Sequence, residues 1–378
     1  MSRAPAHMHF ALDDLTIAAC SRSPAHLAWL REFLEPDFAV GDRERVDCEV
    51  VIDEDGPKYA GLAGAGPPAD AHLLDCFALD SSVVRLPIIR RDDSATCVLD
   101  AQFDAVYVIE PRPRRVTIVT TPGNRRVRAS LLRVVREFAM NHMHGRALLL
   151  HASAVAVGDA GLVIAGHKAA GKTTLLTYLL SRRAGRYLSN DRVLVTDGDG
   201  AQLVRNIPTV ISVRPGTLEF LPEFGRRFET SGFWSYLLTL DEAAASTGEP
   251  IVPNQFGNYF LSPSQFRRLV EAPQKHRCMA SVLVFPVIST EPGTFDLREL
   301  SETEALARLP ETFLGAGGWR KGTDAFAIPG TRPAPDEANL MARAERLLSC
   351  VRAYECLLGP HAYRDGALAS ELAGLTTG

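Results

Sequence analysis

The first third of the chain alternates apolar and polar residues over short runs, which is the pattern of half-buried strands. Segments rich in Gly and Pro, such as 61–70, separate these runs and predict turns. The pattern predicts strands at 12–20, 48–52, 83–91, 95–100, 105–109 and 115–120. We therefore expect residues 1–125 to form a β-rich α+β domain.

The pattern changes after this region. Leu131, Leu132, Val135 and Phe138 recur at the spacing that places apolar side chains on one face of a helix. Gly145 follows, and glycine is suited to the left-handed position that ends many helices. We expect residues 126–146 to form a helix that connects two domains.

From residue 147 the apolar runs become nearly continuous, as in strands that are buried on both faces. Such runs lie at 147–157 and 161–165, and a stripe of leucines predicts a helix over 171–183. Further strands are expected at 192–196, 209–213, 281–287, 294–297 and 353–358, and a further helix over 335–351. This alternation of strands and helices predicts an α/β domain over 147–378.

An insertion near 224–266 interrupts that alternation. It is rich in turn residues and in aromatic side chains, among them Phe228, Phe233, Trp234, Tyr236, Phe256, Tyr259 and Phe260. Such aromatic content argues against a disordered linker. Two interpretations stay open, namely a flap that contacts the substrate or the nucleotide base and ordinary packing of the domain.

Composition limits the classes of function. The 378 residues allow two domains, and a formal net charge of −4 lacks the basic footprint of a nucleic-acid-binding protein. No apolar run approaches the roughly 20 residues needed to cross a bilayer, and the N-terminal residues lack the layout of a signal peptide. We therefore expect a cytoplasmic protein without nucleic-acid or membrane partners.

The seven cysteines form no CxxC pair, which argues against a disulfide framework or a cysteine zinc site.

The strongest motif follows the second apolar run of this domain. It matches the phosphate-binding loop template G-x4-G-K-T and reads Gly166-His167-Lys168-Ala169-Ala170-Gly171-Lys172-Thr173, with Thr174 after it. Backbone N–H groups of such a loop, at the positive end of a helix, cradle phosphate oxygens. Lys172 is expected to reach the β- and γ-phosphates and Thr173 to bind magnesium. The motif predicts that this segment binds ATP and Mg²⁺.

Residues around the loop carry a family resemblance. The segments Leu150-His151-Ala152-Ser153, Gly161–Gly166 and Ser189-Asn190-Asp191-Arg192-Val193 resemble the catalytic domain of HPr kinase/phosphorylase. The resemblance covers about residues 147–300. It implies a P-loop kinase fold of the HPr kinase/phosphoenolpyruvate carboxykinase type, an ATP-dependent transfer to a serine of a small protein, and a homo-oligomer.

The resemblance also implies roles for single residues. Asp191 matches the carboxylate that acts as general base on the acceptor hydroxyl and that contributes to the magnesium site. His151 matches the catalytic histidine, which would orient that carboxylate. Arg277 falls where the family has an arginine that stabilises the transferring phosphoryl group, and Arg214 matches a further arginine of the kinase core.

Three departures from the family pattern bear on activity. The chain has Asn190 where the family has the first of two aspartates, Ser212 where it has a metal-binding glutamate, and His167-Lys168-Ala169-Ala170 inside the loop. These weaken the case for the reverse, phosphorylase reaction. Three functions therefore remain open: a kinase for a serine of a peptide or small protein, a kinase for a small-molecule alcohol, and a regulatory module that binds ATP without turnover.

Overall fold

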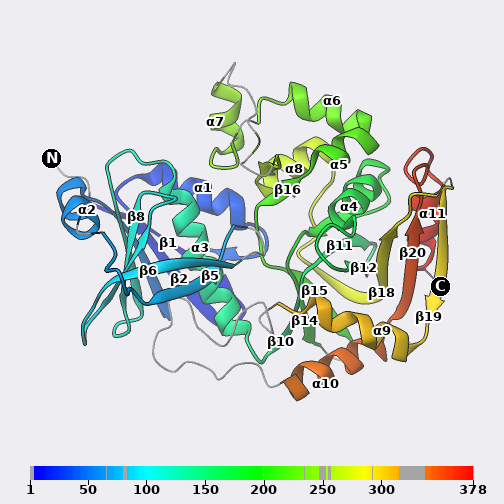
Figure 1. Cartoon of the computed structure of the whole chain (residues 1–378), viewed down its shortest axis with the longest axis horizontal. Coiled ribbons are helices and arrows are strands. Elements are labelled where there is room, and N and C mark those ends of the chain that lie inside the picture. Colours follow the sequence, from blue (N-terminus) through cyan, green and yellow to red (C-terminus); the bar gives the residue numbers. More distant parts are fainter. Residues whose placement is uncertain are drawn as a thin grey trace. The chain divides into compact units, whose positions relative to one another are not determined.

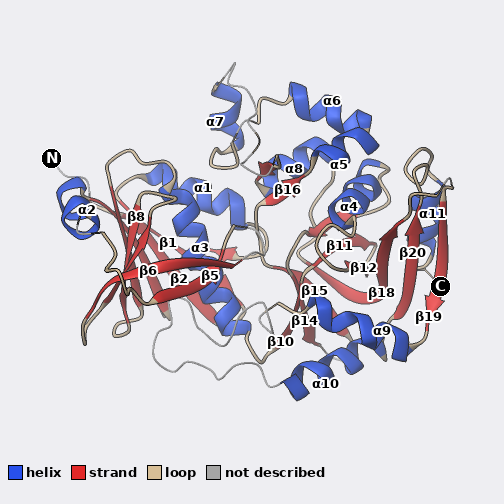
Figure 2. Cartoon of the chain, viewed as in Figure 1, coloured by secondary structure: helices blue, strands red, loops and turns tan. Residues whose placement is uncertain are grey.

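The computed structural model describes residues 4–64, 66–79, 83–198, 200–233, 235–246, 253, 257–291, 293–314 and 337–377. The chain divides into unit 1, Met1–His144 with Gly317–Ala334, and unit 2, Gly145–Ala316 with Pro335–Gly378. Each unit combines helices with one large mixed sheet, so the chain is a mixed α/β protein (Figures 1 and 2). Within the described residues, no helix is long and apolar enough to cross a membrane.

Unit 1 is built on a sheet with the strand order β3-β1-β2-β4-β9-β8-β7-β6-β5. The pairs β2–β4 and β4–β9 are parallel, whereas the other pairs of this sheet are antiparallel. The strands are β1 Ala6–Leu12, β2 Leu15–Ser21, β3 Ala39–Val40, β4 Cys48–Glu54, β5 Leu73–Phe77, β6 Val83–Arg91, β7 Thr96–Asp100, β8 Ala105–Glu110 and β9 Arg115–Thr120. The five strands expected between residues 48 and 120 are confirmed.

The single strand expected over 12–20 is wrong at its start. Leu12 pairs with Leu15, so β1 and β2 form a hairpin with only Asp13 and Asp14 in its loop. The backbone of Asp13 has φ 53°, in the left-handed region that two-residue hairpin loops require and that aspartate tolerates. Apolar residues lie directly on both sides of this loop, because Leu12 and Leu15 are both buried.

The helices of unit 1 are α1 (Pro24–Leu34), α2 (Gly56–Ala63) and α3 (Val127–Met143). The pattern did not predict α1 and α2. Helix α3 corresponds to the helix expected over 126–146, but it contacts β2, β4 and β9 and belongs to unit 1. Its Arg133 is fully buried and pairs with the equally buried Asp100 of β7. A helix that buries charge in this way is part of the layered core of its unit rather than a bare connector.

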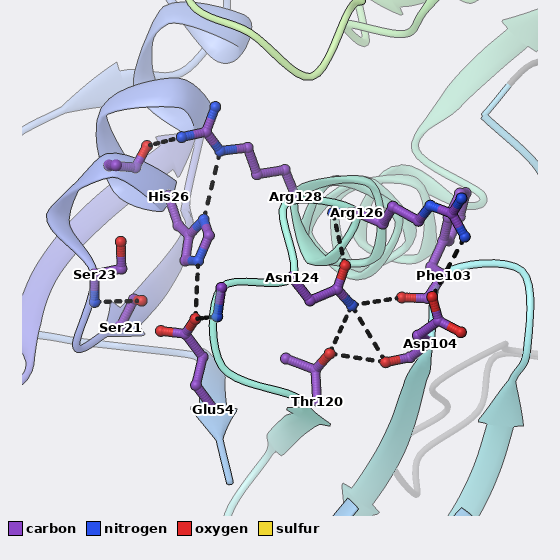
Figure 3. Close-up of polar contacts among 12 residues, drawn as sticks. Ser21, Ser23, His26, Glu54, Phe103, Asp104, Thr120, Asn124, Arg126 and Arg128 are labelled. Carbon is purple, nitrogen blue, oxygen red and sulfur yellow. Dashed lines mark hydrogen bonds and ion pairs between the residues drawn. The ribbon is translucent and has the colours of Figure 1, made fainter. Parts of the chain in front are cut away.

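The parallel strands of unit 1 end at one edge, where polar side chains tie the following loops together (Figure 3). His26 of α1 lies between Arg128 Nε of α3, at 3.4 Å, and Glu54 Oε1 at the end of β4, at 3.7 Å. Asn124 donates to the carbonyl of Phe103 at 2.8 Å and to the hydroxyl of Thr120 at 2.7 Å. These bonds fix the turn between β9 and α3.

Unit 2 is organised around its longest strand, β18 (Arg277–Ile288). Strand β12 (Ala160–Ala165) runs parallel along one side of it. The other side pairs first with β15 (Gln202–Asn206) and then, in parallel, with β20 (Arg352–Leu358). The remaining strands of this sheet are β10 Ala147–Leu150, β11 Ala152–Val157, β13 Arg186–Ser189, β14 Val193–Asp197 and β19 Phe295–Leu300. The apolar run expected as one strand over 147–157 is two strands, with His151 at the break.

Helices cover both faces of this sheet. Leu162 and Ile164 of β12 pack into one core and the intervening Val163 and Ala165 into the other, as alternation along a strand requires. The first core includes side chains of α4 (Lys172–Ser181), α5 (Pro215–Phe220), α6 (Pro222–Thr230), α7 (Leu240–Ala245), α8 (Pro263–Val270) and α11 (Ala367–Gly374). The second includes those of α9 (Glu302–Arg308), the 3-10 helix Leu309–Thr312 and α10 (Glu337–Leu348). The expected helices over 171–183 and 335–351 correspond to α4 and α10.

The insertion near 224–266 contains parts of α6, α7 and α8 together with β17 (Tyr259–Leu261), which pairs with β16 (Ile211–Val213). Phe228 and Phe233 are buried in the first core, and the rings of Phe228 and Tyr259 lie 5.0 Å apart between centroids. Packing therefore accounts for these side chains, rather than a flap. Trp234 and Phe256 lie outside the described residues.

Candidate functional site

Strand directions bring the candidate residues of unit 2 to one edge of its sheet. Strand β11 is antiparallel to both β12 and β13, with Ala152 opposite Ala165 and Ala154 opposite Ser189. The carboxyl ends of β12 and β13 therefore meet the amino end of β11. As a result, His151 before β11, the loop after Ala165, and Asn190-Asp191 after Ser189 lie side by side.

The loop that follows β12, residues 166–173, turns tightly into α4. Gly171 is the residue before the helix and has φ 92°, in the left-handed region. A Cβ at this position would lie 2.9 Å from the end of the Ile288 side chain of β18, which could shift, so it is the backbone angle that requires glycine. Ala169 has φ 74°, a conformation that is strained for alanine. His167, Lys168 and Ala169 are exposed, and Ala170 is buried.

Lys172 is held by the loop itself. Its ammonium Nζ donates to the carbonyls of Gly166 and His167, both at 2.8 Å, and the residue is only 7% exposed. Burial is the main reason that the pKa of Lys172 falls from 10.5 to about 8. The nearby carboxylate of Asp191 raises this pKa, and the guanidinium of Arg214 lowers it further. A buried cation at the start of a helix creates a local environment suited to an anion.

The carboxylate of Asp191 lies between the imidazole of His151 and the guanidinium of Arg192. Its Oδ1 is 3.3 Å from His151 Nδ1, and its Oδ2 is 3.8 Å from the Nε of Arg192, which is fully buried. The backbone of Asp191 has φ 71°, so the residue turns sharply out of the strand that precedes it. The two residues that the sequence proposed as catalytic partners, His151 and Asp191, are thus in contact. Arg192, to which the sequence pattern gave no role, completes this contact.

Asn190 is the residue that connects the loop to this pair. Its side-chain oxygen accepts hydrogen bonds from Thr173 Oγ1 at 3.2 Å and from Ser153 Oγ at 3.1 Å, and the residue is 3% exposed. The sequence marked Asn190 only as a departure from the family and did not single out Ser153. Both residues could have been found from their neighbours: Asn190 directly precedes Asp191, and Ser153 follows His151 by two residues.

Three further candidates lie in α4, directly before α5 and on β16. Thr174 bonds through its hydroxyl to that of Thr217 in α5, at 2.8 Å, which joins the starts of α4 and α5. Arg214 caps α5 and lies close enough to Lys172 to affect its charge. Ser212 lies half-buried on β16.

Arg277 does not lie at this edge, and its assignment to the site is not supported. It begins β18, whereas the end of β18 beside the loop holds Pro286, close to Gly166. Pro286 follows Arg277 by nine positions, which correspond to about 30 Å of strand. Arg277 is exposed, and in the antiparallel ladder of β15 and β18 it lies opposite Arg205.

Three oxygen donors at the edge could contribute to a metal site: the hydroxyl of Thr173, the amide oxygen of Asn190 and the carboxylate of Asp191. Among the described residues, no group of three or more His, Cys, Asp and Glu side chains comes close enough to hold a metal ion alone. Magnesium commonly takes one or two protein carboxylates and completes its shell with phosphate oxygens and water. The donors present therefore fit a magnesium ion that arrives with a phosphate ligand.

Comparisons with known proteins give distant likenesses among solved structures alone. No family model and no curated protein matches the sequence. Among solved structures, the chain is similar to the HPr(Ser) kinase/phosphatase from Coxiella burnetii, at 9% sequence identity over 60% of this chain and 87% of that one. The TM-score is 0.24. A superposition this loose carries no argument about activity, so the function has to be inferred from the residues of the site.

Proposed function

We propose that unit 2 is an ATP-dependent kinase domain of the HPr kinase/phosphoenolpyruvate carboxykinase type. The observation that supports this proposal most directly is the meeting of Lys172, in a loop with the G-x4-G-K-T sequence, with the His151–Asp191 pair at one sheet edge. Phosphoryl transfer needs positioning of the phosphates and a base for the acceptor hydroxyl, and little else. These residues would supply both.

The residues of the 166–173 loop would bind the phosphates of ATP. Their backbone N–H groups and the amino end of α4 would face the phosphate oxygens, and Lys172 would exchange its bonds to the Gly166 and His167 carbonyls for bonds to phosphate. Thr173, Asn190 and Asp191 would hold a magnesium ion, which neutralises charge on the phosphates when it is bound. Arg214, which already acts electrostatically on Lys172, would contribute a further positive charge.

Asp191 would act as the general base. Its carboxylate would accept the proton of the acceptor hydroxyl while that oxygen bonds to the γ-phosphorus and the bond to the β-phosphate oxygen breaks, releasing ADP. His151 and Arg192, on either side of the carboxylate, would keep it oriented. We propose that the acceptor is an alcohol, namely a serine of a peptide or small protein.

One observation favours a second candidate function. Asn190 provides a neutral amide oxygen at the position that contacts Thr173, and a neutral ligand holds magnesium less strongly than a carboxylate. A domain of this kind could bind ATP and respond to it without transferring phosphate. The two functions differ in whether the γ-phosphate leaves the nucleotide.

The test compares wild type with Lys172→Ala, Asp191→Asn and, as a matched control, Arg277→Ala. We expect Lys172→Ala to lose ATP binding and Asp191→Asn to bind ATP but to lose Mg²⁺-dependent turnover by roughly 10²- to 10⁴-fold. Arg277→Ala should behave as wild type because Arg277 lies far from the loop. Turnover is measured as ADP release without an acceptor and with serine-containing peptides. Equal turnover by wild type and Asp191→Asn would exclude the proposed general base, and an absence of ATP binding in wild type would refute the nucleotide site.

A further inference from the structure

A cavity of about 480 Å³ lies in unit 2 beside the second half of α4. Its walls come from α4, from the α5–α6 corner and from the loop that follows β20. Three aromatic rings shape it. Tyr363 lies 5.3 Å from the ring of Tyr178 and 5.9 Å from that of Phe220, measured between centroids. Phe220 is 48% exposed, which is unusual for a phenylalanine in a helix that packs on a core.

Charged side chains complete the walls. The guanidinium of Arg182 lies 5.7 Å from the ring centroid of Tyr178, over its face. Arg226, Arg364 and Glu219 also line the cavity, and within the described part of the chain their side chains make no ion pair. Flat apolar surfaces combined with a few unengaged charges are the usual composition of a site for a planar, polar ligand.

The cavity is connected to the 166–173 loop through Tyr363. This residue is 7% exposed, and its hydroxyl is buried without a hydrogen-bond partner among the described residues. The hydroxyl lies 4.0 Å from the position that a Cβ of Gly171 would occupy. A buried phenol oxygen without a partner is costly, and it indicates a position where a ligand could provide the missing bond.

The cavity begins close to the loop along α4. Tyr178, which lines the cavity, follows Thr174 by four residues, or about 6 Å along the helix axis. A nucleotide whose phosphates bind at the loop would therefore have its ribose and base on the side of the cavity. The cavity volume also lies within the range of ordinary small-molecule sites, roughly 300–1,000 Å³.

We propose that this cavity holds the purine base of the nucleotide, stacked against Phe220, with the hydroxyl of Tyr363 bonded to the ribose or to the first phosphate. Glu219 is positioned to accept from an amino group on the base. This inference rests on the proposed function, because it assumes that the phosphates bind to the 166–173 loop. The base site would add a second set of contacts to those of the phosphates, so the protein would bind a nucleoside triphosphate more tightly than inorganic triphosphate.

The test measures the affinities of ATP and of inorganic tripolyphosphate, each with Mg²⁺, by calorimetry. Phe220→Ala should weaken ATP binding about tenfold, the effect of losing one base–aromatic stack, and leave tripolyphosphate binding unchanged. Met279→Ala is the matched control, because Met279 is 47% exposed and lies near the opposite end of β18. It should change neither affinity. Tyr363→Phe removes only the unpartnered hydroxyl, so it should not lower the stability of the unliganded protein, and it should selectively weaken ATP binding.

The outcomes separate the two proposals. If Phe220→Ala binds ATP as wild type does, the base site is wrong although the kinase proposal survives. The same conclusion holds if both variants weaken ATP and tripolyphosphate equally, since the residues would then act on the phosphate site. If wild type binds neither ligand, both proposals fail.

Discussion

Replacing Lys172 by Met is predicted to stabilise the protein at neutral pH while removing the charge that we propose binds phosphate. Lys172 is nearly buried, and its pKa falls from 10.5 to about 8. A difference of this size corresponds to about 3 kcal/mol of preference for the neutral form in the folded state. Met has a similar volume and carries no charge to desolvate. The lost bonds to the Gly166 and His167 carbonyls oppose this gain by about 1 kcal/mol each, so a net gain of about 1 kcal/mol is expected at pH 7.

The pH dependence provides the stronger test. Below pH 8 Lys172 is charged in the folded and unfolded states, and the folded state carries the full cost of the buried charge. Between pH 8 and 10.5 the unfolded state binds the proton and the folded state does not, so the stability of wild type rises with pH. The advantage of Lys172→Met should therefore shrink from pH 8 upward and change sign before pH 10.5.

The measurement is urea unfolding of wild type and Lys172→Met at pH 7 and pH 10, followed by circular dichroism. Other titrating groups contribute equally to both proteins and cancel in the difference. Lys168→Met serves as the control, because Lys168 is an exposed lysine of the same loop. The reasoning is refuted if the stability difference between wild type and Lys172→Met stays constant over this pH range, or if it changes in favour of the variant as pH rises.

Three further predictions concern single positions. Ala169→Gly should raise the stability by about 0.5–1 kcal/mol, because it removes the strain of φ 74° at the cost of a more flexible unfolded chain; a lower urea midpoint would contradict this. Asn190→Asp should strengthen Mg²⁺-dependent ATP binding by placing a second carboxylate beside Thr173, and equal affinities with and without Mg²⁺ would count against the metal site. Asp100→Asn should destabilise the protein by about 3–5 kcal/mol, because it leaves the buried Arg133 guanidinium without its counter-charge; thermal unfolding measures this, and a change below 1 kcal/mol would show that the pair is relaxed or hydrated.

The fold was predictable where one sheet face is buried and where strands are followed by clear turns. The strands between residues 83 and 120 and helix α4 follow directly from the apolar pattern. The hairpin at Asp13 was not predictable in this way, because its loop consists only of Asp13 and Asp14 and lacks the glycine that usually marks a two-residue hairpin loop. Helix α1 was missed although Pro24 at its first turn is a helix-start signal.

The candidate site was predictable where it depends on local sequence and less so where it depends on strand order. The G-x4-G-K-T motif lies in one continuous segment, residues 166–173, so the sequence alone predicted the loop and the helix that follows it. His151 and Asp191 meet only because β11 lies between β12 and β13, and the resemblance, not the pattern, brought them together. The resemblance assigned Arg277 to the site, although the residue precedes the expected strand 281–287; the sequence does not show that this strand runs parallel to β12, which puts its start far from the loop.

The position of β20 determines the order in which the two units can be completed during synthesis. Residues Arg352–Leu358 pair with β18 on one side and β19 on the other, so the sheet of unit 2 lacks an internal strand until about residue 358 has left the ribosome. All strands of the unit 1 sheet precede residue 121. Long-range pairing of this kind is slow to form and leaves strand edges open in the meantime. The nascent chain should therefore carry a finished first sheet while β18 still exposes an unpaired edge.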